Sequence, residues 1–246
     1  MTGVQTCALP ISIGAAARPV TTYGTRPDAG IRVDVASVGP GGASATLHAG
    51  GRPHDLRLAV DGAHNLLNAA AAVAAAEAVG VPAAAAVEAL AGFAGVHRRF
   101  ERRGSVRGAD FYDDYGHVPT ELEVTLDVAR RTDHRRVLAV FQPHRYSRTQ
   151  ALWKELGASL VGADVIVVTD VYGAAQEPIP GVTGKLVVEG IARTGRDRRV
   201  VYLPHRNDVV EFLAREVRQG DLVLTMGCGD VWMLGDAALE RIEEAS

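Results

Sequence analysis

From residue 96 onward, short apolar runs alternate with longer segments in which apolar residues recur every three or four positions. The short runs predict strands and the longer segments predict helices. Strands are predicted at 108–113, 136–141, 164–169, 199–202 and 221–225, and helices at 118–131, 147–161, 183–194, 206–217 and 230–243. Such alternation is typical of a mainly parallel sheet covered on both faces, so we expect an α/β fold. Residues 101–107 are predicted to add a hairpin partner to the first strand.

The segment before residue 96 has a different pattern. Small strands are predicted at 20–23, 31–35 and 56–60, where apolar and β-branched residues alternate with polar ones, and two helices are predicted at 61–79 and 82–93. These strands are interpreted as the edge of a sheet whose remainder lies elsewhere. The chain is therefore predicted to divide into 13–95 and 96–246. Residues 1–12 show no periodicity and are interpreted as a non-native or scar segment.

Composition argues against several classes of protein. Because 26 Lys and Arg stand against 29 Asp and Glu, the net charge is -3 and no basic field for nucleic acid is expected. The chain has only two cysteines, Cys7 and Cys228, too few for a disulfide scaffold. No apolar run is long enough for a membrane span, and the N-terminus lacks the basic region of a signal peptide. A cytoplasmic protein without a membrane partner is predicted.

Polar side chains are concentrated directly after two predicted strands, at 113–121 and 141–148. We expect these strands to be neighbours, and the carboxyl ends of parallel strands are where open α/β sheets bind ligands. Arg145 and Arg148 lie three residues apart beside His144, an arrangement that suits a carboxylate or a developing oxyanion. Arginines at a helix start interact unfavourably with the helix dipole. A functional role for this pair is therefore favoured over a surface position without a function.

Two further places offer groups for a nucleotide. Asp114 leaves a strand end, where a carboxylate is well placed to accept hydrogen bonds from ribose hydroxyls, whereas Asp113 is interpreted as structural. Asn65 and Asn68 lie three residues apart at a helix start, so their amides share one face and match the mixed donor and acceptor edge of adenine. For either asparagine alone, a helix cap is the simpler interpretation.

Two glycine-containing stretches look like nucleotide motifs but depart from them. Residues 181–186 resemble the end of a phosphate-binding loop, but Leu186 stands where Ser or Thr must hold magnesium. Residues 227–230 follow a strand and open a helix, yet the third glycine of the dinucleotide fingerprint is missing. A tight turn is therefore predicted at 227–230, and a dinucleotide-dependent oxidoreductase is only weakly supported.

Six segments, in this order, resemble motifs of the Mur ligase family. They read G-A-H-N-L-L-N at 62–68, G-V-H-R-R-F-E at 95–101, D-D-Y-G-H-V-P-T-E at 113–121, F-Q-P-H-R-Y-S-R at 141–148, D-V-Y-G-A-A-Q-E-P-I-P-G-V at 170–182 and G-C-G-D-V-W at 227–232. The fourth segment is typical of the member that adds L-alanine to UDP-N-acetylmuramate. The resemblance covers nearly everything from about Val20. It implies that 96–246 form the C-terminal Rossmann-like domain of the family and that 13–95 form the tail of its central, ATP-binding domain.

The resemblance also implies a reaction in peptidoglycan precursor synthesis. In the complete enzyme, ATP phosphorylates the sugar-linked carboxylate, and the amine of L-alanine attacks the acyl phosphate. Asn65 and Asn68 would contact adenine, Asp114 the ribose and Arg99 the nucleotide. L-alanine and the carboxyl group of UDP-N-acetylmuramate would be held by Tyr115, His117, His144, Arg145 and Arg148, of which His117, His144, Arg145 and Arg148 are the candidate catalytic residues.

Parts of the family pattern are missing from this sequence. It contains no glycine-rich loop ending in Gly-Lys-Thr and no UDP-sugar domain. The magnesium ligands that accompany ATP are expected outside this chain, and no metal site is predicted within it. We therefore expect that the chain alone does not catalyse the ligation. Two alternatives stay open: a relative that adds a different amino acid or a peptide, and a non-catalytic module that binds nucleotide or substrate.

Overall fold

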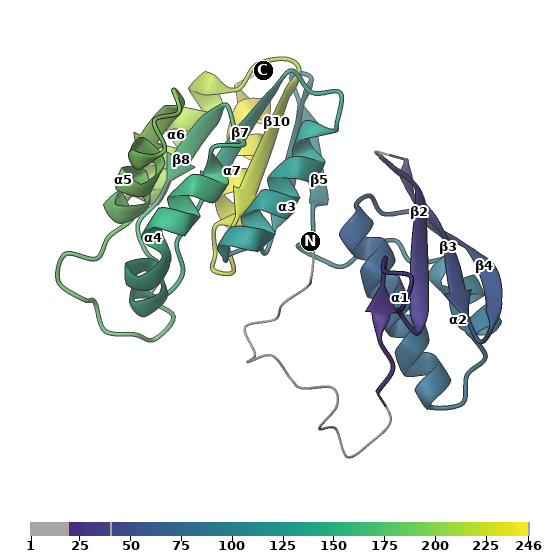
Figure 1. Ribbon diagram of the computed structural model, residues 1–246. Helices are drawn as coiled ribbons and strands as arrows, with labels where there is room; N and C mark the ends of the chain where they lie inside the picture. The colour runs from purple at the N-terminus through teal and green to yellow at the C-terminus, as the bar shows by residue number, and fades with distance from the viewer. Residues whose placement is uncertain (1–19, 40, 246) are drawn as a thin grey trace. The chain divides into compact units, whose positions relative to one another are not determined.

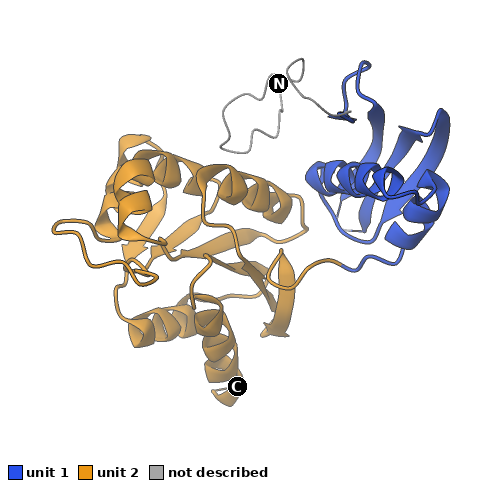
Figure 2. Cartoon of the chain, turned by 90° about the horizontal axis from the view of Figure 1, so that it is seen from below, with its two compact units in different colours: residues 1–94 blue, residues 95–246 orange. Residues whose placement is uncertain are grey.

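The computed structural model describes residues 20–39 and 41–245, which form two compact units. The first unit ends at Ala94 and the second begins at Gly95 (Figure 2). Residues 1–12, interpreted above as a non-native segment, lie outside the described residues. Within the described part of the chain, every helix is too short or too polar to cross a lipid bilayer.

The first unit is a small sheet covered by two helices. The sheet has the order β1-β2-β3-β4, formed by β1 (Tyr23–Gly24), β2 (Ile31–Gly39), β3 (Gly42–Ala49) and β4 (Arg52–Leu58), and the helices are α1 (Ala63–Ala78) and α2 (Ala83–Leu90). Leu47, Leu56 and Leu66 are fully buried between the sheet and α1. Burying one such side chain contributes about 1.5–3 kcal/mol.

The prediction for the first unit missed β3. Every second residue of this strand, from Ala43 to Ala49, is buried, as a half-buried strand requires. Three of those four inward positions are alanine, however, and alanine is depleted in strands. β3 pairs antiparallel with both β2 and β4 and therefore lies between the two strands that the sequence did indicate.

The second unit contains a six-stranded sheet with the order β5-β6-β10-β7-β8-β9. Its strands are β5 (Glu101–Val106), β6 (Ala109–Asp114), β7 (Arg136–Phe141), β8 (Val165–Val168), β9 (Arg199–Tyr202) and β10 (Asp221–Met226). β5 pairs antiparallel with β6, and all other pairs are parallel. The predicted mainly parallel α/β sheet and its antiparallel hairpin partner are both confirmed.

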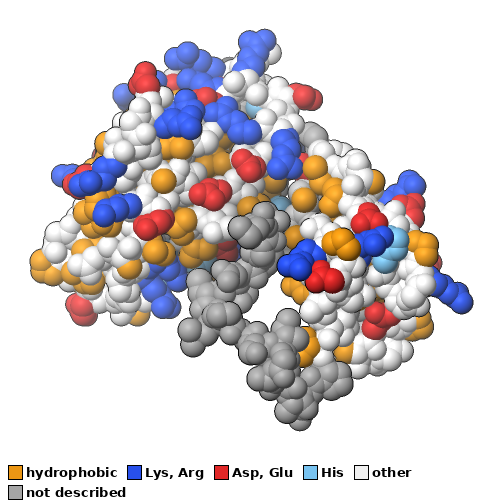
Figure 3. All heavy atoms as spheres, viewed as in Figure 1, with side chains coloured by type: hydrophobic (Ala, Val, Ile, Leu, Met, Phe, Trp, Pro, Cys, Tyr) orange, Lys and Arg blue, Asp and Glu red, His pale blue; other side chains and the backbone are white. Residues whose placement is uncertain are grey.

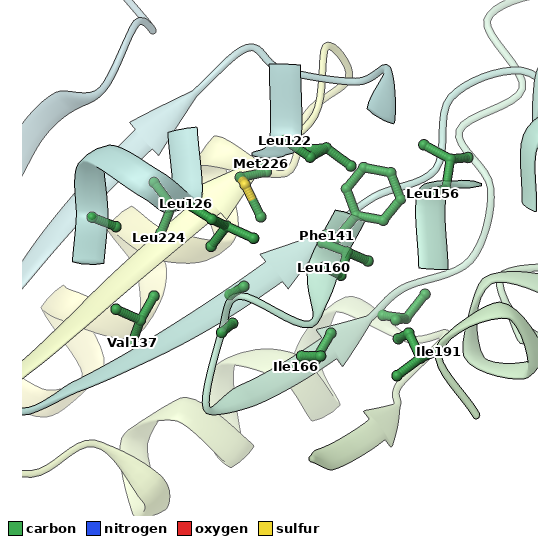
Figure 4. Packing of buried hydrophobic residues seen from close by; sticks show 14 of the residues in the cluster. Leu122, Leu126, Val137, Phe141, Leu156, Leu160, Ile166, Ile191, Leu224 and Met226 are labelled. Atoms are coloured by element: carbon green, nitrogen blue, oxygen red, sulfur yellow. The ribbon is translucent and has the colours of Figure 1, made fainter. Parts of the chain in front are cut away.

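Helices cover both faces of this sheet (Figure 1). One face packs against α3 (Pro119–Arg130), α4 (Tyr146–Leu160) and α5 (Lys185–Arg193), and the other against α6 (Arg206–Glu216) and α7 (Trp232–Glu244). Successive residues of β7 alternate between the two cores: Phe141 packs beneath α3 and α4 (Figure 4), whereas Val140 joins the cluster under α6 and α7. The continuous apolar run of β7 therefore follows from burial on both faces.

The expectation that the strands ending at 113–121 and 141–148 are neighbours is wrong. β10 lies between β6 and β7 and pairs with both. The chain runs outward from β7 to β9, returns through α6 on the opposite face and inserts its last strand at the point where the strand order reverses. Local hydrophobic patterns carry no information on this insertion. Its consequence is that the loop after β10 stands between the two predicted motifs.

Candidate active site

A row of four rings crosses the carboxyl edge of the sheet in the second unit. Tyr115 and His117 follow β6, His144 follows β7, and Tyr172 follows β8. The ring centroids of successive members are 5.6, 5.8 and 5.8 Å apart. The structure therefore brings together three residues that the sequence assigned to substrate and adds Tyr172, to which no role was assigned. The carboxyl edge of the strands is where open α/β sheets bind ligands.

The loop Gly227–Asp230, which follows β10, is held from the β6 side by Arg98. The guanidinium of Arg98 donates to Asp113 Oδ2 at 2.8 Å, to the Gly227 carbonyl at 2.7 Å and to the Gly229 carbonyl at 3.1 Å. The Arg98 side chain is 14% exposed and that of Asp113 is 1% exposed. This buried ion pair fixes the loop, and the structural interpretation of Asp113 agrees with it.

Arg99, the predicted nucleotide contact, has a different environment from Arg98. Its side chain is 48% exposed and lies 3.9 Å from Glu121. The guanidinium also lies 5.5 Å from the centroid of the Tyr115 ring, while that of Arg98 lies 5.2 Å from it. Arg99 is thus available to a ligand, whereas Arg98 is occupied. Adjacency in sequence did not reveal which arginine was the anchor.

On the β7 side, the same loop is held through Asp230. Gln142 donates from Nε2 to Asp230 Oδ1 at 2.9 Å, and Arg206 at the start of α6 donates to Asp230 Oδ2. Gly229 packs against Gln142 and Tyr172 so closely that a methyl group there would overlap both. The loop is therefore held in place between the β6 and β7 motifs; it is a bend, and no turn hydrogen bond joins residues 227–230 to one another.

Asp114, the predicted ribose contact, is almost completely buried. Its Oδ1 accepts from the Gly116 N–H at 2.7 Å, and its Oδ2 accepts from the Phe100 N–H at 2.9 Å. Burial raises the pKa of the carboxyl group, and the two backbone donors and Arg99 oppose that rise. The Thr125 side chain also hydrogen-bonds to the carboxylate. Three of its roughly four acceptor positions are therefore occupied, and one further donor can still be accepted.

His117 is oriented by the start of α3. Its backbone N–H donates to Glu121 Oε2 at 2.9 Å, and Nδ1 lies 3.1 Å from the Tyr115 carbonyl oxygen. A carbonyl oxygen only accepts, so Nδ1 carries a proton in this contact, and the same nitrogen lies 3.4 Å from Glu121 Oε2. Glu121 lies in the first turn of α3, where a carboxylate is stabilised by the helix dipole.

His144 lies between Tyr172 and His117 and is held as a neutral imidazole. Arg148 Nη1 is 3.2 Å from His144 Nδ1, and a guanidinium has only donors, so Nδ1 is the acceptor and the proton is on Nε2. Burial, followed by the charges of Arg148, His117 and Arg145, lowers the pKa of His144 to about 4. Arg145 is exposed at the N-cap of α4, in a backbone conformation with φ 68°.

The candidate adenine contacts belong to the first unit. Asn65 donates from Nδ2 to the Asp61 carbonyl at 2.7 Å and is half-buried, so this contact leaves its carbonyl oxygen and its second Nδ2–H uncommitted. Asn68 is exposed, one turn further along α1. Neither side chain caps the helix, whose N-cap is Gly62.

Among residues 20–39 and 41–245, no group of three or more His, Cys, Asp or Glu side chains is placed to hold a metal ion. Side chains of both charges are interspersed over the face of the second unit in Figure 3. At the carboxyl edge of the sheet, Arg98 is paired with Asp113 and Arg99 lies near Glu121, whereas no ion pair to a carboxylate is formed by Arg145 or Arg148 among the described residues.

Fold and site together define a doubly wound α/β domain with histidine, tyrosine and arginine side chains at the strand ends beside its switch point. The model of the family described as Mur ligase, glutamate ligase domain, matches residues 98–229, more than half of the chain. The chain therefore belongs to the Mur ligase family.

Several relatives within the family share one name, UDP-N-acetylmuramate–L-alanine ligase. The UDP-N-acetylmuramate–L-alanine ligase of Kineococcus radiotolerans is 46% identical over 227 residues, which cover 92% of this chain and 47% of that protein. The enzyme of the same name from Desulforamulus reducens is 46% identical over 189 residues, 77% of this chain and 41% of that protein. The crystal structure of the Thermotoga maritima UDP-N-acetylmuramate–alanine ligase has a TM-score of 0.71 at 26% identity and covers 92% of this chain and 48% of that one. The chain spans about half the length of the curated relatives it matches.

Proposed function

We propose that this chain carries the amino-acid-binding half of the active site of a ligase that joins L-alanine to UDP-N-acetylmuramate at the expense of ATP. The observation that carries the proposal is the cluster at the ends of β6 and β7, where His117 contacts His144 and Arg148 hydrogen-bonds to His144, with Arg145 exposed next to His144 in the chain. Support comes from relatives named for this reaction, which are 46% identical to the chain.

The chemistry of this cluster suits an amino acid whose amine must act as a nucleophile. Arg145 and Arg148 supply two guanidiniums for a carboxylate. The Tyr115 ring lies on the other side of His117, beside Arg98 and Arg99. His144 offers a neutral Nε2–H donor to an oxygen, and the neutral form of His117 offers its Nε2 lone pair to a proton of the amine. Fixing the carboxylate while the amine stays free orients the nucleophile and lowers the entropic part of the barrier.

ATP, when bound, supplies the phosphoryl group that activates the sugar-linked carboxylate. In the second unit, the exposed Arg99 suits the nucleotide as a charged contact, and Asp114 suits the ribose through its remaining acceptor position. In the first unit, Asn68 and the free carbonyl oxygen of Asn65 suit the adenine edge. The magnesium ion that accompanies ATP is assigned to ligands outside this chain.

The proposal is tested by alanine-dependent release of phosphate from ATP in the presence of UDP-N-acetylmuramate. The chain alone is expected to release none. A chimera that joins this chain to the preceding half of the Kineococcus radiotolerans ligase is expected to release phosphate with L-alanine. In that chimera, Arg148→Ala should lower kcat/KM for L-alanine by at least about 100-fold, because an oriented charged contact to the carboxylate is lost.

The matched control is Arg215→Ala, an exposed arginine of α6 remote from the candidate site, which should leave the kinetics unchanged. Phosphate release by the chain alone would contradict the expected dependence on the missing half. A chimera that prefers another amino acid or a peptide would favour a different Mur-type ligase. Nucleotide binding without ligation in the chimera would favour a non-catalytic module.

A further inference from the structure

Tyr172 is anchored to the end of β7 by its backbone. Its N–H donates to the Pro143 carbonyl at 2.8 Å, and its carbonyl accepts from the Arg145 N–H at 2.8 Å, so that Tyr172 and His144 form an isolated parallel bridge. A second anchor lies farther along the same loop, where Gln176 Nε2 donates to Ser147 Oγ at 2.9 Å. The position of Tyr172 is therefore tied to the segment between β7 and α4, which contains His144.

The ring of Tyr172 is confined on two sides. It stacks on the His144 imidazole with an interplanar angle of 12° and a centroid distance of 5.8 Å. A methyl group placed on Gly229 would lie 2.8 Å from Tyr172 Cγ, so the ring rests on the bare backbone of the loop after β10. Because Arg98 and Asp230 hold that loop, the ring cannot retreat from His144 without moving a fixed floor.

His144 needs such support because its own hydrogen bonds leave one edge uncommitted. Arg148 donates to Nδ1, which defines the tautomer with the proton on Nε2. The His117 ring meets His144 at 70°, an edge contact that does not hold the imidazole plane. The stacked Tyr172 ring is the contact that fixes this plane, just as outer partners fix the ring orientation of a functional histidine in other sites.

We propose that Tyr172 is a positioning residue of the amino-acid site, holding His144 so that its Nε2–H faces an oxygen of the bound substrate. This assignment rests on the proposed function for the identity of that substrate. The orientation of the His144 imidazole by Tyr172 does not depend on which substrate binds and can be tested without a ligand. Tyr172 therefore acts through His144 and takes no proton itself.

The test is ¹⁵N NMR of the His144 imidazole in the whole chain, with the signal assigned from a His144→Gln variant. In the wild-type chain, Nδ1 should be unprotonated at neutral pH, and the pKa should lie near 4. Tyr172→Ala uncovers one face of the imidazole and lets the ring turn away from Arg148. It should therefore mix the two tautomers and move the pKa toward the ordinary imidazole value of about 6.5. Tyr172→Phe keeps the ring and should reproduce the wild-type signals. The charges of Arg145, Arg148 and His117 are the same in all of these chains.

Tyr23→Ala is the matched control, because Tyr23 is 43% exposed in the first unit and Tyr172 is 39% exposed. It should leave the His144 signals unchanged. An Nδ1–H tautomer in the wild-type chain, or wild-type signals in Tyr172→Ala, overturns the proposal. If the alanine variant does not fold, Tyr172→Leu replaces it and should show the same mixing of tautomers and the same direction of pKa change. Since no substrate is used, failure of the proposed function in the chimera leaves this result standing.

Discussion

At the scale of single residues, the ionisation of His144 makes the stability of the folded chain depend on pH. Its pKa is lowered to about 4 in the folded chain, against about 6.5 for an ordinary imidazole. Between these values, the unfolded chain binds more protons than the folded chain, so the stability that His144 contributes is complete above about pH 6.5 and is lost as the pH falls toward 4. The surroundings of His144 thus favour the neutral imidazole that a donor role requires.

We expect His144→Gln to reduce the loss of stability between pH 7 and pH 5, because glutamine takes up no proton in either state. The measurement is urea unfolding of both chains at the two pH values, compared as the difference in free energy of unfolding. His205→Gln, at an exposed histidine before α6, is the control for histidine replacement as such. An unchanged pH dependence in His144→Gln would show that His144 ionises equally in the folded and unfolded chains.

Sequence patterns identified most of the residues of the candidate site but not the role of each one. Tyr115, His117 and His144 were assigned to one site, and the structure brings their rings together. The family resemblance assigned Arg99 to the nucleotide and gave Arg98 no role, and only the fold shows that Arg98 is the buried anchor. Tyr172 lay within a motif without an assigned role, because its stack on His144 depends on a bridge between the ends of β7 and β8.

At the scale of elements, Arg98 joins β6 to the loop after β10. Replacing Arg98 by Ala should lower the free energy of unfolding by about 3–5 kcal/mol, since Asp113 would remain as an unpaired buried charge. Arg99→Ala is the adjacent control and should change stability by less than about 1 kcal/mol, because its pair with Glu121 is exposed. Chemical unfolding at neutral pH measures both. Equal losses in the two variants would contradict the assignment of Arg98 as the anchor.

The same scale shows why local patterns predict elements better than their order. The strands and helices beyond residue 96 follow from buried runs and amphipathic segments, each defined within about ten residues. The place of β10 depends on a return through α6, and its register joins residues more than eighty positions apart. In the first unit, the alanines of β3 give a weak local signal, and pairing with β2 and β4 supplies what propensity does not.

At the scale of the whole molecule, each unit has its own core. The apolar clusters of the second unit contain only residues beyond Gly95, and the cluster of the first unit contains only residues before Ala94. A segment of this size buries enough apolar surface to be stable by itself. We therefore expect residues 95–246, expressed alone, to unfold cooperatively in urea and to keep the His144 imidazole signals of the whole chain.

The matched experiment leaves the chain whole and weakens only the first unit. Leu47 is fully buried in β3, so Leu47→Ala should cost the first unit about 2–5 kcal/mol. Tryptophan fluorescence follows the second unit selectively, because both tryptophans, Trp153 and Trp232, lie in it. Its urea midpoint should be the same in wild type, Leu47→Ala and residues 95–246. A midpoint that falls in Leu47→Ala would mean that the two units unfold as one, and the predicted boundary near residue 95 would then not separate independent domains.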